Sequence, residues 1–293
     1  MLEVFLTVSL AYILKRLGFF SEEHSKVLVN YVLYFPLPFL SFRTAHELGL
    51  SKDVFAVGLG AWIVILLSLL VAYGLGKLLR LDSVNLRTFM MISAFGNTAF
   101  LGYPYSHTYF GEEGLEYAVI YDSVGSFLAV SSVGFLIVSG KLDLKSIFFF
   151  PPFLGLLLGF ITKDYALPSF VVKFMDFSIA SLLPVVLFSL GISLEFSRMG
   201  KNLKLLSLAV LLKMFLSPAI ALFALKPLSM DNTAYMVSVL ESAMPTMITA
   251  CILVLKYGLN HNLAFASAGI GIVVSFFSVP LWVFLLENLQ LGS

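Results

Sequence analysis

The sequence predicts an all-helical integral membrane protein, with about ten transmembrane helices arranged as two inverted five-helix repeats. Its 293 residues are 59% hydrophobic and only 12% charged, whereas soluble domains carry about 25% charged residues. The mean hydropathy of +0.98 leaves too few polar residues to cover a water-facing surface. Ten spans of roughly 20 apolar residues each would use almost the whole chain. We therefore expect no separate soluble domain.

Composition also argues against several classes of protein. The net charge is +1 and basic runs are missing from the sequence, so we expect no nucleic-acid partner. Nucleophile motifs, phosphate loops and paired-carboxylate patterns are missing too, which argues against an enzyme and against an organic cofactor. The single cysteine, Cys251, excludes an internal disulfide and is expected to be a packing residue. The four histidines show no metal-ligand spacing, so the only metal we consider is a coupling Na⁺.

The chain contains ten apolar runs, each of which we predict to be a helix. The first run lacks the positively charged segment of a signal peptide, so we expect it to be retained as a short helix. Turn-forming and charged residues separate the runs, as in Gly111-Glu112-Glu113-Gly114. The predicted helices are residues 2–17, 25–44, 53–79, 87–108, 114–139, 145–162, 171–194, 203–224, 232–256 and 262–287.

Lysine and arginine placement predicts the orientation in the membrane. Loops after the odd-numbered helices hold twelve of these residues and the loops on the opposite side hold five, while Lys213 lies inside a span. Cytoplasmic loops are enriched in Lys and Arg. The odd-numbered loops are therefore expected in the cytoplasm, with both termini outside.

The two halves of the chain share a pattern. Each has an aromatic-Met pair, a small-residue stretch, a proline and an aromatic-Gly turn, at Phe89-Met90, Pro104 and Phe110-Gly111 and again at Tyr235-Met236, Pro245 and Tyr257-Gly258. The aromatic-Met pairs and the aromatic-Gly turns are 146–147 residues apart, which is half the chain. Five helices is an odd number, so the halves would insert with opposite orientations, as is typical of secondary transporters. The predicted repeats are residues 1–143 and 144–293.

The fourth and ninth helices are each expected to be interrupted in mid-membrane. In the fourth helix, residues that disfavour a continuous helix are close together in Gly96-Asn97-Thr98-Ala99-Phe100-Leu101-Gly102-Tyr103-Pro104. The ninth helix has a similar segment, Glu241-Ser242-Ala243-Met244-Pro245-Thr246. Proline removes a backbone hydrogen bond, and the freed groups must face protein or a water-filled cavity. Broken ends at matching places in inverted halves should meet near the bilayer midplane, where helix N–H groups favour an anion.

We expect a substrate site at this crossover, formed by Gly96, Asn97, Thr98, Gly102, Pro104, Ser242, Met244, Pro245 and Thr246. Freed carbonyl groups and Asn97 could also hold a cation there. The alternative interpretation is that the prolines only kink their helices. Elsewhere, the Gly-x-x-x-Gly match at Gly155 and Gly159 is weak in a chain with 21 glycines.

Three ionisable residues, Asp122, Lys213 and Glu241, lie inside predicted spans. Each costs about 2.5 kcal/mol or more at the bilayer centre on insertion scales, so each should face protein or water and have a partner. One interpretation is that Glu241 or Asp122 binds a coupling proton or Na⁺. The other is a structural pair between Lys213 and an acid, which joins helices. Both interpretations stay open at this point.

These motifs resemble the auxin efflux carrier family of transporters, and the resemblance extends over essentially the whole chain. The residues that carry it are Gly96 to Pro104 in the fourth helix, Tyr121-Asp122 in the fifth, Leu183-Pro184 and Gly191 in the seventh, Ala243-Met244-Pro245 and Leu255-Lys256-Tyr257-Gly258 in the ninth, and Ser267 to Pro280 in the tenth. Two departures are a short first helix and the absence of the long central loop of plant auxin carriers, since only Leu142 to Lys145 joins the halves. They indicate a compact prokaryotic-type member in an inner membrane, and they weaken the case for auxin itself.

The resemblance implies the fold class of bile acid symporters and Na⁺/H⁺ antiporters. Helices 1, 2, 6 and 7 would form a scaffold that dimerises, and helices 3–5 and 8–10 a mobile transport unit with an elevator mechanism. The implied substrates are small organic anions. Polar residues on helices 4, 5 and 9 bind Na⁺ in the bile acid relatives, and Asn97, Ser123, Ser126 and Glu241 stand in comparable places here.

The sequence thus predicts a secondary active or facilitative transporter of a small carboxylate. A Na⁺/H⁺ exchanger of the same fold class is the first alternative, although the fifth helix carries a single acid, Asp122. A non-transporting membrane sensor is the second alternative, and it would need a signalling partner.

Overall fold

The computed structural model describes residues 2–49, 51–140, 150–194 and 203–290. In these ranges the regular elements are all helical, and the only strand-like pairing is an isolated bridge between Gly96 and Thr246. Five stretches of the described chain are long and apolar enough to cross a membrane, and α10 is a shorter apolar helix. The five are Lys52–Leu78, Thr98–Ser139, Ser169–Ser193, Leu203–Leu228 and His261–Leu289.

The elements follow one another along the chain with short connections. The first half contains α1 (Leu2–Arg16), α2 (Glu22–Tyr34), α3 (Pro36–Leu48), α4 (Lys52–Leu78), α5 (Ser83–Ala94), η1 (Thr98–Gly102), α6 (Tyr103–Ile120), η2 (Tyr121–Ser126), α7 (Phe127–Ala129), η3 (Val130–Gly134) and α8 (Phe135–Ser139). The second half contains α10 (Pro151–Thr162), α11 (Ser169–Ala180), α12 (Leu182–Ser193), α13 (Leu203–Leu211), η4 (Leu212–Leu216), α14 (Ser217–Ala224), η5 (Lys226–Leu228), α15 (Asn232–Ser242), α16 (Ile248–Lys256) and α17 (His261–Gln290).

Prolines account for two departures from the predicted ranges. The predicted helix 25–44 is two helices, α2 and α3, because Phe35 precedes Pro36 and leaves the helical conformation. The predicted helix 171–194 is divided into α11 and α12 at Ser181, shortly before Pro184. The segment from Leu142 to Lys145, predicted to join the halves, lies outside the described residues.

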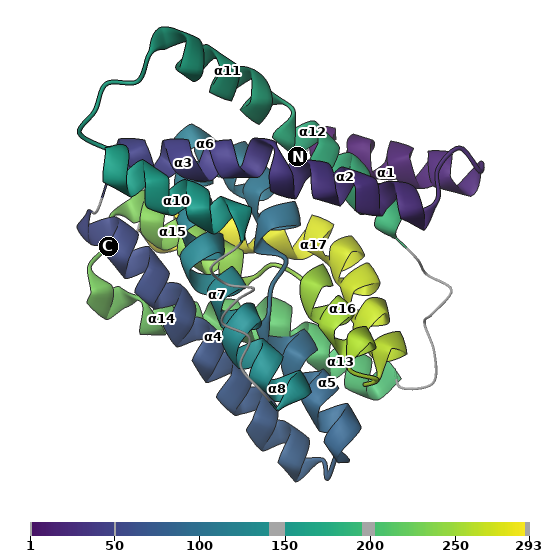
Figure 1. Cartoon of the computed structure of the whole chain (residues 1–293). Helices are drawn as coiled ribbons and strands as arrows, with labels where there is room; N and C mark the ends of the chain where they lie inside the picture. Colours follow the sequence, from purple (N-terminus) through teal and green to yellow (C-terminus); the bar gives the residue numbers. More distant parts are fainter. Residues whose placement is uncertain (1, 50, 141–149, 195–202, 291–293) are drawn as a thin grey trace.

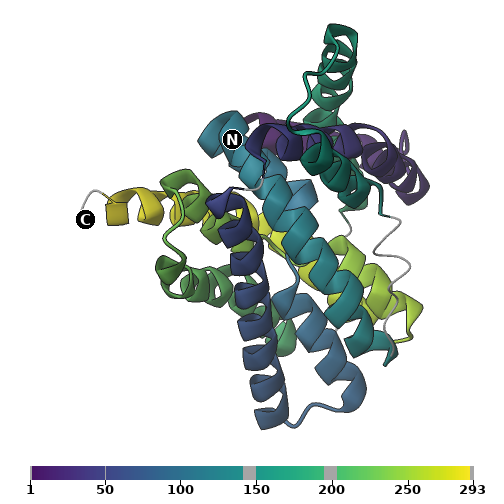
Figure 2. The same cartoon turned by 60° about the vertical axis from the view of Figure 1, so that its left-hand side comes forward.

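Six helices form what we call the first helix group: α1, α2, α3, α10, α11 and α12 (Figure 1). Its most extensive contact joins α3 to α10, where a Cβ on Gly155 or Gly159 would collide with the carbonyl groups of Pro38 and Phe42. Small residues let transmembrane helices approach closely. Gly155 and Gly159, whose spacing alone is weak evidence for a helix contact, therefore lie at the contact between α10 and α3. Helix α11 projects from the rest of the molecule in both views (Figures 1 and 2).

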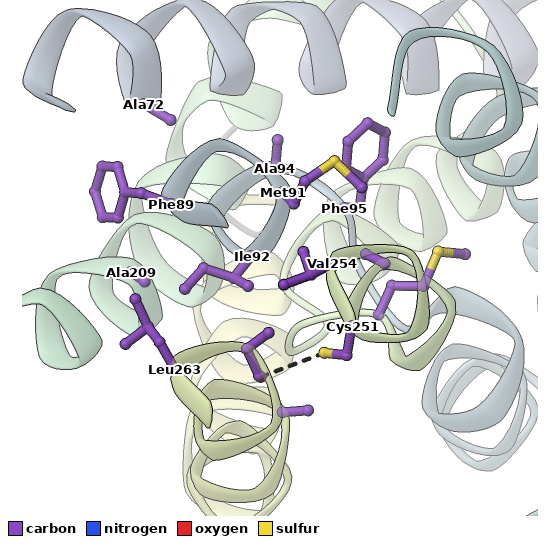
Figure 3. Packing of buried hydrophobic residues seen from close by; sticks show 14 of the residues in the cluster. Ala72, Phe89, Met91, Ile92, Ala94, Phe95, Ala209, Cys251, Val254 and Leu263 are labelled. Carbon is purple, nitrogen blue, oxygen red and sulfur yellow. Dashed lines mark hydrogen bonds between the residues drawn. The ribbon is translucent and has the colours of Figure 1, made fainter. Parts of the chain in front are cut away.

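The second helix group consists of α4–α8 with η1–η3 and α13–α17 with η4 and η5, and α5 is packed inside it. Helix α5 contacts α4, α13, α16 and α17, and its Phe89, Met91 and Ile92 are fully buried (Figure 3). Cys251 of α16 belongs to the same packing, and its thiol donates to the Ala264 carbonyl at 3.3 Å. Because lipid is as apolar as these side chains, close packing holds such helices together.

The two groups meet where α3 and α12 contact α6 and η1. A buried apolar cluster crosses this boundary, with members Val4, Val8, Leu101, Tyr105, Leu187, Leu190, Leu240 and Met244. The interrupted segment that begins at η1 therefore lies at the boundary between the groups.

Candidate functional site

The first interruption separates α5 from η1. Helix α5 ends at Ala94, Phe95 is extended, and helical structure resumes at Thr98. The resumed helix begins as a π turn in which the Tyr103 N–H donates to the Thr98 carbonyl. Pro104 has no N–H to donate to the preceding turn, and such wider turns often lie at functional sites. Pro104 itself lies in the first turn of α6, beyond the interruption, and so is not at the break where the sequence pattern places it.

The second interruption separates α15 from α16. Helix α15 ends at Ser242 and α16 begins at Ile248, so the break is longer than the first. Pro245 lies within the break itself. The two prolines that look equivalent in the sequence therefore have different places in the fold.

The two interruptions cross each other and share backbone hydrogen bonds. The Asn97 N–H donates to the Pro245 carbonyl at 2.7 Å, and the Met247 N–H donates to the Phe95 carbonyl at 2.9 Å. Gly96 and Thr246 thereby form an antiparallel bridge. Backbone groups that leave a helix inside a membrane must find partners in the protein. Each interruption supplies partners for the other, as the predicted crossover requires.

Asp122 lies beside the first interruption, on η2. Thr98 Oγ1 donates to its Oδ1 at 2.5 Å, and the Tyr103 hydroxyl donates to its Oδ2 at 2.9 Å. Both oxygens of this buried carboxyl group therefore have a donor. Ser123 and Ser126 are buried in the same π turn.

Glu241 lies at the second interruption, in the last turn of α15, and is fully buried. Ser106 Oγ donates to its Oε1 at 2.8 Å. Its carboxylate is packed against Gly102, where a Cβ would overlap it. Oε2 has no hydrogen-bond partner in the described part of the chain. Glycine at position 102 is therefore what allows the acid of one half to reach the interrupted helix of the other half.

Lys213 reaches the crossing from η4. Its Nζ donates to the Ser242 carbonyl at 2.6 Å, and its stem passes beside Gly96. Within the described ranges no carboxylate lies within ion-pair distance of this ammonium group. The direct lysine–acid pair that the sequence allows is thus replaced by a contact with a helix end.

The crossing brings most of the predicted site residues together, but not all in the expected role. Among the predicted site residues in the described chain, three polar atoms are buried without a hydrogen-bond partner: Asn97 Nδ2, Ser123 Oγ and Glu241 Oε2. Thr246 is already committed, because its hydroxyl contacts the Ile92 carbonyl at 2.8 Å and Ser267 Oγ at 2.7 Å.

Two further predicted residues are also committed to contacts within the protein. The Ser242 hydroxyl donates to the Val239 carbonyl at 2.6 Å in the preceding turn. Met244 packs in the apolar cluster between the helix groups. Neither side chain offers a free polar group at the crossing.

Sequence reasoning missed Tyr103 and Ser106 as partners of the two acids. Both are polar residues in an apolar helix, and residues three apart share one face of a helix. That spacing could have placed both near the crossing. It could not have shown that they serve different acids.

Other titratable groups lie away from the crossing. In the described part of the chain no group of three or more His, Cys, Asp and Glu side chains could hold a metal ion. His107 lies near the protein surface, where its Nε2 is 3.2 Å from Glu112 Oε1.

Comparison with known proteins gives matches over nearly the whole chain. A family model described as "Membrane transport protein" matches residues 1–143 and again residues 135–283. An uncharacterized transporter of Methanothermobacter thermautotrophicus is 30% identical over 289 residues, covering 96% of this chain and 95% of the relative. An uncharacterized transporter of Methanocaldococcus jannaschii is 30% identical over 300 residues, covering 97% of each chain.

Proposed function

Because the chain belongs to the membrane transport protein family, which includes the auxin efflux carriers, we propose that it carries a small organic anion across the membrane. It is a transporter and not an enzyme. The proposed substrate has a carboxylate, and the proposed transport is secondary active or facilitative.

The observation that carries this proposal is the set of unpartnered buried atoms at the crossing. Asn97 Nδ2 is a donor without an acceptor among the described residues, and Asn97 stands directly before the first turn of η1. The opening N–H groups of η1 and α16 lack partners within their own helices. Buried donors that remain unpaired cost free energy. A carboxylate bound between these two helix starts would supply the missing acceptors and be favoured by both helix dipoles.

The charges at the crossing favour coupling to a cation. Asp122 and Glu241 are two buried acids, and Lys213 is one buried base. An anionic substrate would add a further negative charge in a medium where unpaired charge is costly. A proton or Na⁺ bound beside Asp122 or Glu241, with Asn97, Ser123 and Ser126 as further polar groups, would offset it.

The proposed architecture is ten helices in two inverted repeats, residues 1–143 and 144–293. Two features of the fold support this architecture. Gly111 and Gly258, which the sequence repeat aligns, both have φ of +68°, and the two interruptions pair through an antiparallel bridge.

The proposed mechanism is an elevator, in which the second helix group moves against the first. The interrupted helices and the three buried charges found in the described residues belong to the second group, and the interrupted segment that begins at η1 lies at its boundary with the first. The first group would then be a scaffold and form a homodimer. The exposed Phe170 and Phe177 of the projecting α11 are a candidate surface for that contact or for lipid.

The proposed location is the cytoplasmic membrane, with both termini outside. Cys251 is buried, so the unmodified protein should not react with a membrane-impermeant maleimide. We expect the exposed variant Asp164→Cys to be labelled in intact cells and the exposed variant Glu23→Cys only after lysis. The opposite pattern would invert the topology.

Uptake into proteoliposomes tests the substrate class. Radiolabelled mono- and dicarboxylic acids should accumulate above empty liposomes, with and without a pH or Na⁺ gradient, whereas uncharged amides of the same acids should not. Asn97→Ala should abolish uptake, and Asn288→Ala, at an exposed position of α17, should not. Unchanged uptake by Asn97→Ala would remove Asn97 from the site, and failure of every acid would rule out the substrate class.

A second candidate function is Na⁺/H⁺ exchange, which the two buried acids favour. It predicts that proton flux driven by Na⁺ proceeds without any organic acid. A protein that binds organic acids but shows no flux of either kind would instead be a sensor.

A further inference from the structure

The carboxyl end of α15 stops inside the protein. The Leu240 and Glu241 carbonyl groups accept from the Ala243 and Met244 N–H groups at 2.9 and 3.2 Å, and the helix dipole places a partial negative charge at this end. Glu241, in the same last turn, adds a buried carboxyl group. This end of the helix is therefore suited to hold a cation.

Lys213 supplies a cation at this point. Its Nζ donates to the Ser242 carbonyl at 2.6 Å, and the residue is only 2% exposed. The position is fixed by neighbouring contacts, because the Trp282 indole donates to the Met214 carbonyl at 2.8 Å and holds η4 against α17. Gly96 leaves the room that the stem requires, since a Cβ there would lie 3.0 Å from Lys213 Cε.

The other interrupted helix ends without a charge. At the carboxyl end of α5, the Thr246 hydroxyl contacts the Ile92 carbonyl at 2.8 Å, and the Met247 N–H donates to the Phe95 carbonyl. Both partners are neutral. Within the described residues, the carboxylate of Asp122, the acid nearest this half, accepts hydrogen bonds only from two hydroxyl groups. Among the residues that the structure describes, a fixed cation is thus present at one half of the crossing and missing from the other.

We propose that Lys213 is the built-in cation of the crossing, which occupies the place of an exchangeable ion at the carboxyl end of α15 and balances Glu241. This rests on the proposed function only in that it concerns the same crossing. It assigns any coupling proton or Na⁺ to the Asp122 side. The transporter would then exchange one cation in each cycle and not two.

Chemical rescue of the full-length protein, purified in detergent without any organic acid, tests this proposal. Lys213→Ala should lower the midpoint of thermal unfolding, and propylammonium, which carries the missing stem and charge, should restore several degrees of it. Propanol at equal concentration should not. The exposed control Lys204→Ala should keep the wild-type midpoint and gain nothing from propylammonium. If propanol restores as much as propylammonium does, Lys213 only fills space and the proposal is wrong.

A second pair of variants keeps the test decisive if Lys213→Ala does not fold. Lys213→Arg keeps the charge and Lys213→Met keeps only the apolar stem. We expect the Met variant to unfold several degrees below the Arg variant in choline chloride, and Na⁺ to raise its midpoint by more than that of the wild type. A Met variant as stable as the Arg variant, without added dependence on Na⁺, would overturn the proposal. Neither measurement involves transport, so both outcomes are independent of the substrate class.

Discussion

The two interrupted segments follow similar backbone paths but have different side-chain chemistry. In the first, α5 leads through Phe95 to η1, and its acid is Asp122 on a neighbouring turn. In the second, α15 leads through Pro245 to α16, and its acid is Glu241 on the interrupted helix itself. The first acid has two hydroxyl donors, whereas the second has one hydroxyl donor and a lysine nearby.

The repeat of the two halves determines the path of the backbone at the crossing, but it does not determine which charged residues lie there. The backbone crossing needs both halves, because each interruption bonds the groups that the other frees. The charged groups need not repeat, because a buried charge can be balanced from any helix that reaches it. One half can therefore hold a permanent cation while the other binds one reversibly. Variants that change one half at a time can therefore separate the two roles.

Asp122→Ala should have the largest effect on stability. It leaves the buried Thr98 and Tyr103 hydroxyl groups without an acceptor, at about 1–3 kcal/mol each. Asp122→Asn keeps one acceptor oxygen and should cost less, yet it should lose coupling to a cation. Denaturant unfolding in detergent measures the first effect and gradient-driven uptake the second. Asp164→Ala, at an exposed loop position, is the matched control. A stability of Asp122→Ala equal to that of the control would contradict the hydrogen bonds described.

Gly102→Ala tests the contact between the halves. Its Cβ would overlap the Glu241 carboxylate, and overpacking of this kind costs about 1–3 kcal/mol. Misplacing the acid should also reduce uptake by about ten-fold or more. Gly74→Ala in α4 has open space around its Cβ and should leave uptake unchanged, with a stability gain of about 0.5–1 kcal/mol. Equal behaviour of the two variants would show that Gly102 is not constrained by Glu241.

Ser106→Ala should have a smaller effect, confined to the second half. It removes one donor to Glu241 Oε1, and a hydrogen bond to a charged group contributes about 1.5–3 kcal/mol. We expect a loss near the lower end of that range, because Lys213 still balances the acid. Combining Ser106→Ala with Lys213→Met should cost more than the sum of the single losses. Simple additivity in this double-mutant cycle would argue against a shared role in holding Glu241.

Asp82→Asn should have the smallest effect, visible only in acid. Asp82 caps α5, and its bond from the Asn85 N–H lowers the pKa of this carboxyl group below its usual value. Stabilisation by the carboxylate is thus present above the usual Asp pKa, and it is lost as the pH falls through the lowered one. Asparagine also caps a helix but does not titrate. The variant should therefore show a flatter decline of the unfolding midpoint between about pH 5 and pH 2. An unchanged decline would mean that other carboxyl groups set the acid limit.

Much of the site could be predicted from local sequence. Gly96-Asn97 and Pro245 mark the two interruptions, because glycine, asparagine and proline disfavour a continuous helix wherever they stand. Asp122, Lys213 and Glu241 are conspicuous because each is a charge in an apolar run. The sequence placed Pro104 at the first interruption, but it lies in the first turn of α6. Proline is tolerated in the first turn of a helix, so it need not mark a break.

The membrane class, most of the helix ranges and the two interruptions follow from local sequence, because hydropathy and backbone preference are properties of neighbouring residues. The divisions before Pro36 and at Ser181, and the place of Pro104 inside α6, were not predicted. Which side chains become partners depends on the fold as a whole. Ser106 donates to an acid 135 residues away, and Thr246 to a carbonyl 154 residues away. Such pairs depend on how two helices cross, and no local pattern records that angle. The partner of Lys213 also depends on the fold. Its ammonium group contacts the end of a helix and not a carboxylate, and this contact is why we propose that it is a permanent cation and not one member of an ion pair.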